Sequence, residues 1–457
     1  MKLHYITIQP TTSKMSEELL ALEKTFLTKV AFQPLATYEG ELHTLIKGEK
    51  WGAAEELFEQ FKVSVKQMNP AVPPWAPRLE QLLTIEAQRV QGKDQQIWVK
   101  SVYKCVKEIR QEYWLAWLED FFCEKIEWAL QHCTQGQKDG EEHLYCVALP
   151  EFTFVDSGNA VQEFYGPGEK GSRAFYKSVV TKFLLGCLPD DVPRIDSKMR
   201  TLRQLTRLDD YEKKQIIIFA GTVIGRNRES ENKEAKEGRS PYYNMAPVFT
   251  RGSCVGVWEK QEISEIDGKS YMEQHRHVTW TTMQDKAIAG YTASVFSEKE
   301  LHDMSMQPLS PVFEITVFQK TLRFALCICK DYGKPAIIGG KPAEVYVLLS
   351  YGMAIDAHDE TQTCIHEIGK NVEVFLYCDG IQRDGIRRKN NRDIRGQVCI
   401  KRGDSAFWWS TIEESERTWK NIDIHLLPRP SYNNQYAAPG IYIAPNVLDW
   451  NPIQRKS

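Results

Sequence analysis

From residue 143 onward the chain is a succession of short apolar runs, each bounded by polar or glycine-containing segments. Short apolar runs between turn residues are typical of strands buried in a sheet. Segments with a helical period, such as 172–185 and 356–368, separate some of these runs. The two patterns together predict a mixed α/β fold with mostly buried sheets. The predicted strands lie at residues 143–149, 215–224, 245–248, 255–258, 313–317, 322–329, 344–349, 372–377 and 397–400.

The N-terminal part of the chain has a different pattern. Residues 3–9 predict a strand, whereas from 14 to 134 apolar side chains recur at helical spacing, which predicts helices. The stretch 97–130 predicts one long amphipathic helix or two helices in line. A proline-rich stretch at 70–77 must be a turn or an extended link, because proline cannot continue a helix.

These patterns predict one domain spanning residues 1–457, within which residues 30–135 form a helical insertion or elaboration. Residues 226–240 are a charged run that predicts a solvated loop. Residues 428–457 begin with many Pro, Tyr and Asn residues, and we expect an irregular C-terminal tail there.

The composition narrows the class of partner. A net charge of −3 gives no reason to expect nucleic acid or an anionic membrane as a partner. No apolar run approaches the roughly 20 residues that span a bilayer, and the N-terminus lacks the apolar core of a secretory signal. We therefore expect a cytoplasmic protein, with export by a route that needs no cleavable signal left open.

The eleven cysteines are scattered and include no CxxC pair. Cys327 and Cys329 are two residues apart, which would place both on one face of a strand, but no second pair of metal ligands accompanies them. We expect reduced thiols, with no disulfide framework and no metal site. Because no glycine-rich phosphate-binding motif occurs either, we expect no cofactor.

Three predicted strands end on chemically useful residues. Glu151, Lys260 and Cys329 each follow an apolar run, and Cys329 is followed at once by a polar turn that contains Gly333. Taken singly, each has an ordinary structural explanation as a surface charge or a small core residue. Together they place a carboxylate, an amine and a thiol at strand ends, where open α/β sheets gather their catalytic groups. This set is what a thiol amidase or nitrilase requires.

The segments that carry these residues resemble those of the nitrilase, or carbon–nitrogen hydrolase, superfamily, in the same order. Glu151 lies in VALPEFTF, Lys260 in NMAPVFTRGSCVGVWEKQEIS, and Cys329 with Asp331 in LRFALCICKDYGKP. IIIFAGTVIG and AEVYVLLS resemble the strands that follow the glutamate and the nucleophile. The resemblance covers roughly residues 143–400 and implies a four-layer α-β-β-α sandwich, here with an N-terminal helical insertion.

The resemblance also implies roles. Cys329 would be the nucleophile, Glu151 the general base, and Lys260 a fixed positive charge for the developing oxyanion. The backbone N–H of Lys330 would be a second oxyanion donor. Asp331 is expected to cap the turn after the nucleophile.

Parts of the family pattern are absent or ambiguous. Tyr332-Gly333-Lys334-Pro335 stands where the family often has an aromatic–Pro–Glu turn, so the resemblance assigns no substrate. We expect Tyr243 near the pocket. A second, structural glutamate usually follows the lysine, and the sequence leaves Glu262, Glu265 and Glu273 as candidates.

The function expected is therefore hydrolysis of a non-peptide carbon–nitrogen bond in a small molecule, an amide rather than a nitrile, with acyl transfer to another amine as a variant. The alternative is a catalytically inert scaffold whose helical insertion binds a protein.

The resemblance is compatible with a homodimer. Cys364 and His366 could suggest a Cys–His protease, but two residues apart on a helix they would not face one another.

Overall fold

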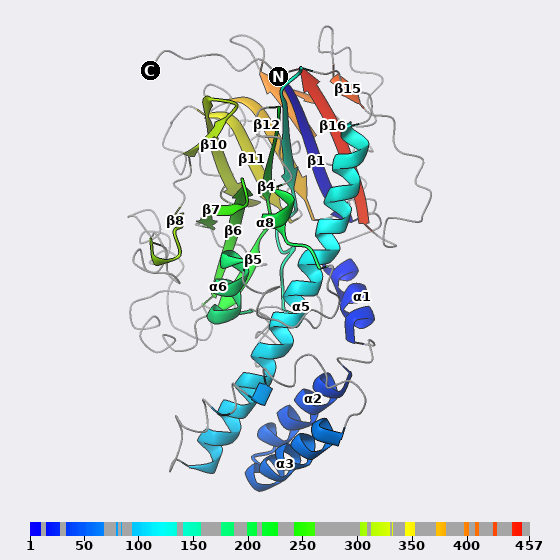
Figure 1. The fold of residues 1–457 in the computed structure, drawn as a ribbon, viewed down its shortest axis with the longest axis vertical. Coiled ribbons are helices and arrows are strands. Elements are labelled where there is room, and N and C mark those ends of the chain that lie inside the picture. Colours follow the sequence, from blue (N-terminus) through cyan, green and yellow to red (C-terminus); the bar gives the residue numbers. More distant parts are fainter. Residues whose placement is uncertain are drawn as a thin grey trace, which may run out of the picture.

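The structure is a computed structural model of the whole chain. It describes residues 1–10, 15–27, 33–67, 79–80, 84, 94–134, 140–156, 175–186, 199–207, 213–226, 242–260, 302–308, 312–329, 331, 343–351, 372–380, 397–401, 407–410, 424–426 and 441–449. These residues form a mixed α/β fold with two sheets and flanking helices (Figure 1).

The first sheet has ten strands, in the order β15-β16-β1-β2-β4-β6-β5-β3, with β7 and β8 continuing from β6. Its centre is parallel, because β1 pairs with β2 and β2 with β4 in the same direction. The strands are β1 (Lys2–Pro10), β2 (His143–Ala148), β3 (Phe175–Tyr176), β4 (Lys214–Phe219), β5 (Val223–Arg226), β6 (Tyr242–Thr250), β7 (Ser253–Glu259), β8 (Gln307–Pro308), β15 (Ile424–Leu426) and β16 (Ile441–Asp449).

The second sheet has six strands, in the order β14-β13-β12-β11-β10-β9. Its three central strands, β10, β11 and β12, are parallel, and the outer ones are antiparallel. The strands are β9 (Val312–Val317), β10 (Lys320–Ile328), β11 (Ala343–Ser350), β12 (Val372–Asp379), β13 (Gln397–Lys401) and β14 (Phe407–Ser410).

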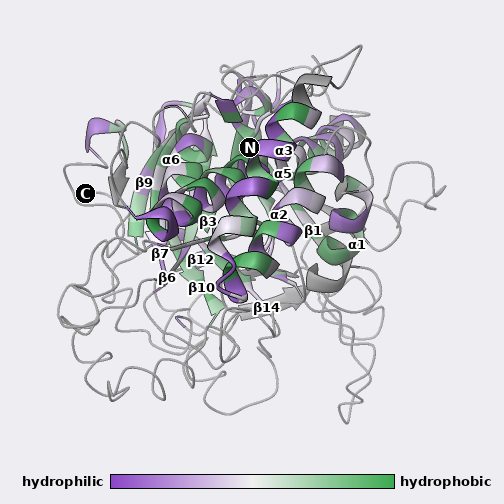
Figure 2. Ribbon diagram, turned by 90° about the horizontal axis from the view of Figure 1, so that it is seen from below, coloured by the Kyte–Doolittle hydropathy of each residue, from purple (hydrophilic) through white to green (hydrophobic). Residues whose placement is uncertain are grey.

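The helices are α1 (Met15–Leu27), α2 (Gln33–Lys47), α3 (Trp51–Gln67), α5 (Gln95–Thr134), α6 (Lys177–Leu185) and α8 (Leu202–Leu205). The stretch predicted as one long helix or two in line is a single helix of 40 residues. In Figure 1, α5 runs from beside α2 and α3 at one end to beside β1 and β16 at the other. Figure 2 shows α2 and α3 with alternating hydrophobic and hydrophilic residues, as the helical period predicted.

The period-two pattern of β2 shows how the layers form. Leu144, Cys146 and Ala148 point into a core shared with the second sheet, whereas Tyr145 and Val147 point into a core shared with the helices. Successive strand residues face opposite sides of a sheet, so a strand that is apolar throughout can bury both faces. The first sheet is therefore sandwiched between the helices and the second sheet.

The outer face of the second sheet is also buried, and the side chains of Tyr346 and Phe375 stack there at 5.0 Å between ring centroids. The helix predicted at 356–368, which would contribute to a fourth layer on that face, lies outside the described residues. The mixed α/β fold is confirmed over the described residues, and the four-layer arrangement stays a prediction.

The prediction of an irregular tail over residues 428–457 is wrong for Ile441–Asp449, which form β16. This strand pairs antiparallel with β1 along its whole length, from Lys2 opposite Asp449 to Pro10 opposite Ile441. Pro445 lies within this strand although proline lacks the N–H that a ladder needs. On the β15 side, the described pairing of β16 runs over residues 446–448 and leaves Pro445 outside it.

The apolar run at 215–224, predicted as one strand, is two strands, β4 and β5. They are separated at Gly221, whose φ of +69° is readily adopted only by glycine. The turn redirects the chain so that β4 lies between β2 and β6, whereas β5 lies between β6 and β3.

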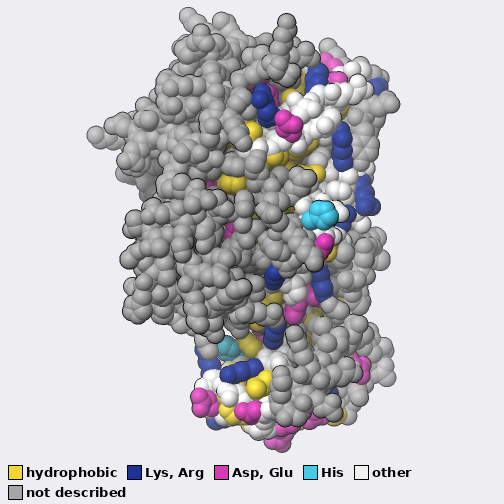
Figure 3. All heavy atoms as spheres, turned by 90° about the vertical axis from the view of Figure 1, so that its left-hand side faces the viewer, with side chains coloured by type: hydrophobic (Ala, Val, Ile, Leu, Met, Phe, Trp, Pro, Cys, Tyr) yellow, Lys and Arg dark blue, Asp and Glu magenta, His cyan; other side chains and the backbone are white. Residues whose placement is uncertain are grey.

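The described surface is mixed in charge. Figure 3 shows Lys and Arg side chains interspersed with Asp and Glu over the described part of one face, in keeping with 58 basic and 61 acidic residues in the chain.

Among the described helices, none is long and apolar enough to span a membrane. The cysteines whose side chains the structure describes are free thiols.

The C-terminal half of α5 contains a buried carboxyl group that should make stability depend on pH. Burial raises the pKa of Glu119 to about 8, although its Oε1 accepts a hydrogen bond from the Leu202 N–H at 2.9 Å. The unfolded chain loses this proton near pH 4.5, so the folded state loses stability as the pH rises from about 4.5 to 8.

We expect Glu119→Gln to remove this loss, because glutamine keeps an acceptor for Leu202 without a charge. The gain in the free energy of unfolding should be on the order of 5 kcal/mol at pH 8.5 and near zero at pH 4. Urea unfolding at the two pH values measures it, with Glu127→Gln, on a part-exposed position of the same helix, as the control. An equal effect at both pH values would contradict the prediction.

Candidate active site

A buried ion pair joins two of the predicted residues. Lys260 Nζ lies 2.7 Å from Glu151 Oε1, and both side chains are almost completely buried. Asn244 Nδ2 donates to the same carboxylate oxygen at 2.9 Å, while the backbone carbonyl of Asn244 accepts from the backbone N–H of Lys260 at 2.9 Å. Removing either ionised partner would leave a buried charge uncompensated, so the pair is held as a unit.

Cys329 lies directly after β10 in an unusual backbone conformation. Its φ is +46°, a region that costs a non-glycine residue about 1–3 kcal/mol and persists only where the surroundings impose it. Asp331 supplies part of that constraint, because its Oδ2 accepts from the Ile328 N–H at 3.3 Å and from Trp258 Nε1 at 3.2 Å. The turn after β10 is therefore fastened to β7, the strand that precedes Lys260.

Ser350, the last residue of β11, links the thiol to the glutamate. Its carbonyl accepts from the backbone N–H of Glu151 at 3.3 Å and from that of Gly380 at 2.9 Å. Its hydroxyl lies 4.0 Å from Cys329 Sγ. The second sheet thus supplies both Cys329 and the residue that holds the backbone of Glu151.

The turn that carries Glu151 is fixed from its own sheet as well. Phe152 has a φ of +62°, and its N–H donates to Thr222 Oγ1 at 2.8 Å. Thr153 Oγ1 donates to the Pro150 carbonyl at 2.6 Å. Gly221 lies so close that a Cβ placed there would be 2.3 Å from the same carbonyl oxygen.

The expectation that Cys327 and Cys329 share one face is wrong. β10 ends at Ile328, and the left-handed residue that follows turns Cys329 into the core between the two sheets, where Cys327 does not lie. Burial, and next the Asp331 carboxylate, raise the pKa of the Cys327 thiol well above its ordinary value. Cys327 is therefore an inert internal reference for the reactivity of Cys329.

The structure describes little of the remaining predicted site residues. Lys330 and Glu265, together with the alternatives Glu262 and Glu273, lie outside the described residues. So do the turn 332–335 and the pair Cys364 and His366. Tyr243 lies in β6 beside Asn244, with its backbone paired to Gly225. Its side chain is not among those described.

Sequence reasoning gave no role to Asn244, Trp258 or Ser350, each of which contacts a predicted site residue. A signal for Ser350 was available, because it is a polar residue at the end of an apolar strand, as Glu151 and Cys329 are. Asn244 lies near the start of β6 and Trp258 lies within β7, so the same criterion could not find them.

Comparisons with known proteins return similar solved structures only. No family model and no curated protein matches the chain. An amidase from Nesterenkonia sp. is 11% identical over 58% of this chain and 73% of that chain, with a TM-score of 0.27. A CN-hydrolase superfamily protein from Xanthomonas campestris is 13% identical over 61% and 75%, with a TM-score of 0.26. A glutamine-dependent NAD+ synthetase from Acinetobacter baumannii is 12% identical over 74% and 46%, with a TM-score of 0.30.

Similarity at these identities and TM-scores assigns neither a family nor an activity to this chain. What the arrangement can do chemically follows from its own residues. A buried carboxylate paired with an ammonium group, and linked to a strand-end thiol through Ser350, provides a proton acceptor and a positive charge.

The close approach at Gly221 gives a test of how tightly the turn before Glu151 is held. We expect Gly221→Ala to destabilise the fold by clearly more than Gly252→Ala, which shares a positive φ but faces only the flexible side chain of Arg207. The left-handed backbone alone should cost about 1–2 kcal/mol at either position. Urea unfolding of the two variants measures the difference, and equal losses would mean that the Pro150 contact is easily relieved.

Proposed function

We propose that this chain is a cysteine-dependent hydrolase of a non-peptide carbon–nitrogen bond and a divergent member of the nitrilase superfamily. The observation that supports it most is the buried Lys260–Glu151 ion pair, which Ser350 links to Cys329, a thiol on a strained backbone. Nucleophile, base and cation come from three separate strand ends, as covalent catalysis at a sheet margin requires.

In the first half of the reaction, Glu151 accepts the proton of the Cys329 thiol, and the thiolate attacks the amide carbon. The carbonyl oxygen becomes negatively charged, and Lys260 stabilises that charge together with the backbone N–H of Lys330. The tetrahedral intermediate collapses as the carbon–nitrogen bond breaks. Glu151 returns the proton to the departing amine, which leaves a thioester on Cys329.

In the second half, Glu151 accepts a proton from water, and the resulting hydroxide attacks the thioester carbon. The bond to sulfur breaks, the acid product leaves, and the proton returns to the thiolate. If an amine took the place of water, the same site would carry out acyl transfer. Asp331 and Ser350 hold the turns and take no part in proton transfer.

The substrate we propose is a small amide rather than a nitrile. Tyr243 and the turn 332–335 are the candidates for shaping its pocket, and Glu265 is a candidate for the second structural carboxylate. A cytoplasmic location, a homodimer and a protein partner at the helical insertion remain predictions.

Thiol labelling tests the proposed nucleophile. We expect iodoacetamide at neutral pH to modify Cys329 faster than any other cysteine and Cys327 not at all, with peptide mass spectrometry as the readout. Glu151→Gln should slow the modification of Cys329 because the proton acceptor is gone. If Cys329 is no more reactive than the other ten thiols, the nucleophile assignment fails and the alternative hypothesis of a catalytically inert scaffold is favoured.

Turnover is tested by screening amides and nitriles for ammonia release. Cys329→Ser should abolish the activity. Lys260→Met should lower kcat by about 100- to 1000-fold, the usual effect of losing an oxyanion-stabilising group, provided the variant folds. Glu127→Gln serves as a control that leaves the site untouched. Activity that survives in Cys329→Ser would contradict the mechanism.

A further inference from the structure

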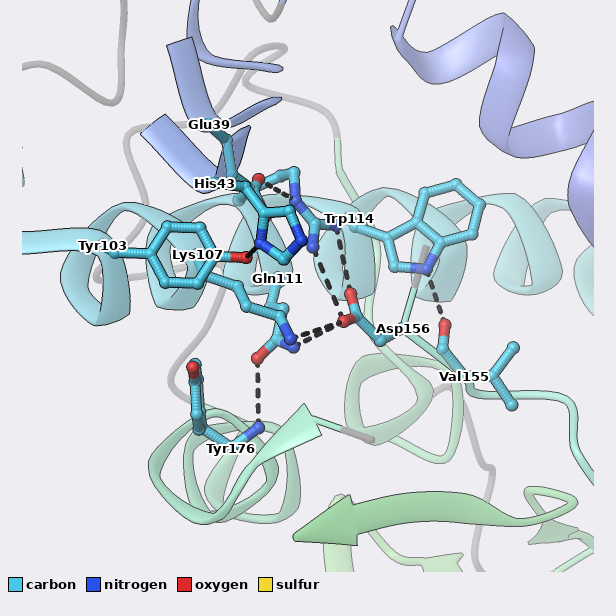
Figure 4. Close-up of polar contacts among 10 residues, drawn as sticks. Glu39, His43, Tyr103, Lys107, Gln111, Trp114, Val155, Asp156 and Tyr176 are labelled. Atoms are coloured by element: carbon cyan, nitrogen blue, oxygen red, sulfur yellow. Dashed lines mark hydrogen bonds and ion pairs between the residues drawn. The ribbon is translucent and has the colours of Figure 1, made fainter. Parts of the chain in front are cut away.

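A buried cluster of charged and polar side chains lies where the middle of α5 meets the segment after Glu151. α5 contributes Lys107, Arg110 and Gln111, and the segment after β2 contributes Asp156, five residues beyond Glu151 (Figure 4). All four side chains are buried. The cluster is separate from the ion pair of the candidate active site and needs its own explanation.

Asp156 is the centre of this cluster. Arg110 reaches both of its oxygens, with Nη1 at 3.1 Å from Oδ1 and Nη2 at 3.5 Å from Oδ2. Gln111 Nε2 donates to Oδ2 at 2.7 Å, and Lys107 Nζ lies 3.9 Å from the same oxygen. One turn further along α5, Trp114 Nε1 donates to the carbonyl of Val155 at 2.7 Å. Two successive residues of the segment are therefore held by the helix.

The cluster also joins further parts of the fold. Glu39 of α2 forms a second ion pair with Arg110, so the guanidinium lies between two carboxylates. The Gln111 side-chain carbonyl accepts from the backbone N–H of Tyr176 at 3.0 Å, and Figure 4 shows Gln111 between Asp156 and Tyr176. α5 thus contacts the chain both at Asp156 and at Tyr176.

The charges within the cluster compensate one another. Burial alone would lower the pKa of the Arg110 guanidinium, but Asp156 and then Glu39 outweigh it and raise that pKa above its ordinary value, with a smaller contribution from Glu23. Lys107 lies beside Asp156 as a second cation. Removing one partner from such a set leaves a buried charge without compensation, which makes its geometry hard to alter piecemeal.

The segment between Glu151 and Asp156 is held from two sides. The first sheet holds its middle, since the Phe154 N–H donates to the Thr222 carbonyl at 3.0 Å and the Phe154 carbonyl accepts from Ile224 at 3.2 Å. α5 holds its end through Val155 and Asp156. Phe152, directly after Glu151, has a positive φ, so the segment that α5 and the sheet hold begins in the turn that carries Glu151.

We propose that Asp156 and the α5 side chains that hold it form a positioning site for Glu151, so that the helical region fixes the general base of the enzyme. This inference rests on the proposed function of Glu151. Asp156, Arg110, Gln111 and Trp114 are positioning residues, because they act through the segment and not on the substrate. Displacements of about 1 Å at a catalytic group can lower rates by up to about 100-fold, so such a support is functionally important.

The experiment follows alkylation of Cys329 in the full-length chain. Second-order rate constants with iodoacetamide are measured by peptide mass spectrometry from pH 5 to 9, in wild type, Glu151→Gln and Asp156→Asn. We expect Asp156→Asn to lower the rate at pH 7 by about tenfold and to move the pH midpoint toward that of an ordinary thiol. Asp156→Glu, which keeps the charge, should recover part of the rate.

Two controls separate positioning from general destabilisation. Arg200→Gln removes an arginine that pairs with Asp120 and Glu127 further along α5, and it should leave the Cys329 profile unchanged. In a Glu151→Gln background, Asp156→Asn should have no further effect, because a residue that acts only through Glu151 is silent once Glu151 is gone.

Trp114→Phe covers the case in which Asp156→Asn does not fold. It keeps a buried aromatic ring and removes only the donor to Val155, and we expect a severalfold loss of rate. A wild-type rate and pH profile in Trp114→Phe, or in a folded Asp156→Asn, overturns the positioning inference. An effect of Asp156→Asn that persists undiminished in the Glu151→Gln background also overturns it. A wild-type Cys329 that is unreactive, or that does not respond to Glu151→Gln, overturns the proposed function instead.

Discussion

The ion pair between Lys260 and Glu151 constrains the whole molecule, because two charges withdrawn from water are tolerated only in accurate geometry. That geometry comes from elements far apart in the sequence. Glu151 follows β2, Lys260 follows β7, and Ser350 at the end of β11 holds the backbone of Glu151 from the opposite sheet. The apolar core between the two sheets therefore does more than stabilise the fold, since it sets the register in which these strand ends meet.

Backbone strain in the described part of the candidate site is found at two turns, one beside Glu151 and one at Cys329. Phe152 follows the glutamate and Cys329 is the thiol itself, and both have positive φ. Neither is glycine, so the surrounding hydrogen bonds must impose the conformation. Asp331 does so for Cys329 and Thr222 does so for Phe152. At Cys329, directly after β10, the turn directs the chain out of the strand where its side chains would otherwise continue to alternate.

Much of the fold was predictable, because buried strands and amphipathic helices leave local periodicities in the sequence. Glu151 and Cys329 were also predictable, since each ends such a strand. What failed depends on distant partners or on single turns. β16 was missed because it pairs with β1, more than 400 residues away, and because the stretch that leads into it is rich in Pro, Tyr and Asn. The orientation of Cys329 was missed because one left-handed residue reverses the rule of alternation. Nothing local could pair Arg110 with Asp156, 46 residues away.

The length and composition of α5 support more than a packing role. Forty helical residues extend about 60 Å. Three of the buried charged side chains of α5, those of Lys107, Arg110 and Glu112, lie near its middle. This middle lies between the part of α5 that contacts α2 and α3 and the part that contacts the first sheet. An apolar contact surface there would hold α5 to the first sheet and the segment after β2 without any cost of removing charges from water. Apolar contacts, however, tolerate sliding and rotation, whereas a guanidinium that reaches both oxygens of one carboxylate fixes direction as well as distance. A polar cluster is thus the better choice where the position of the next segment, and not only its attachment, matters to the chemistry.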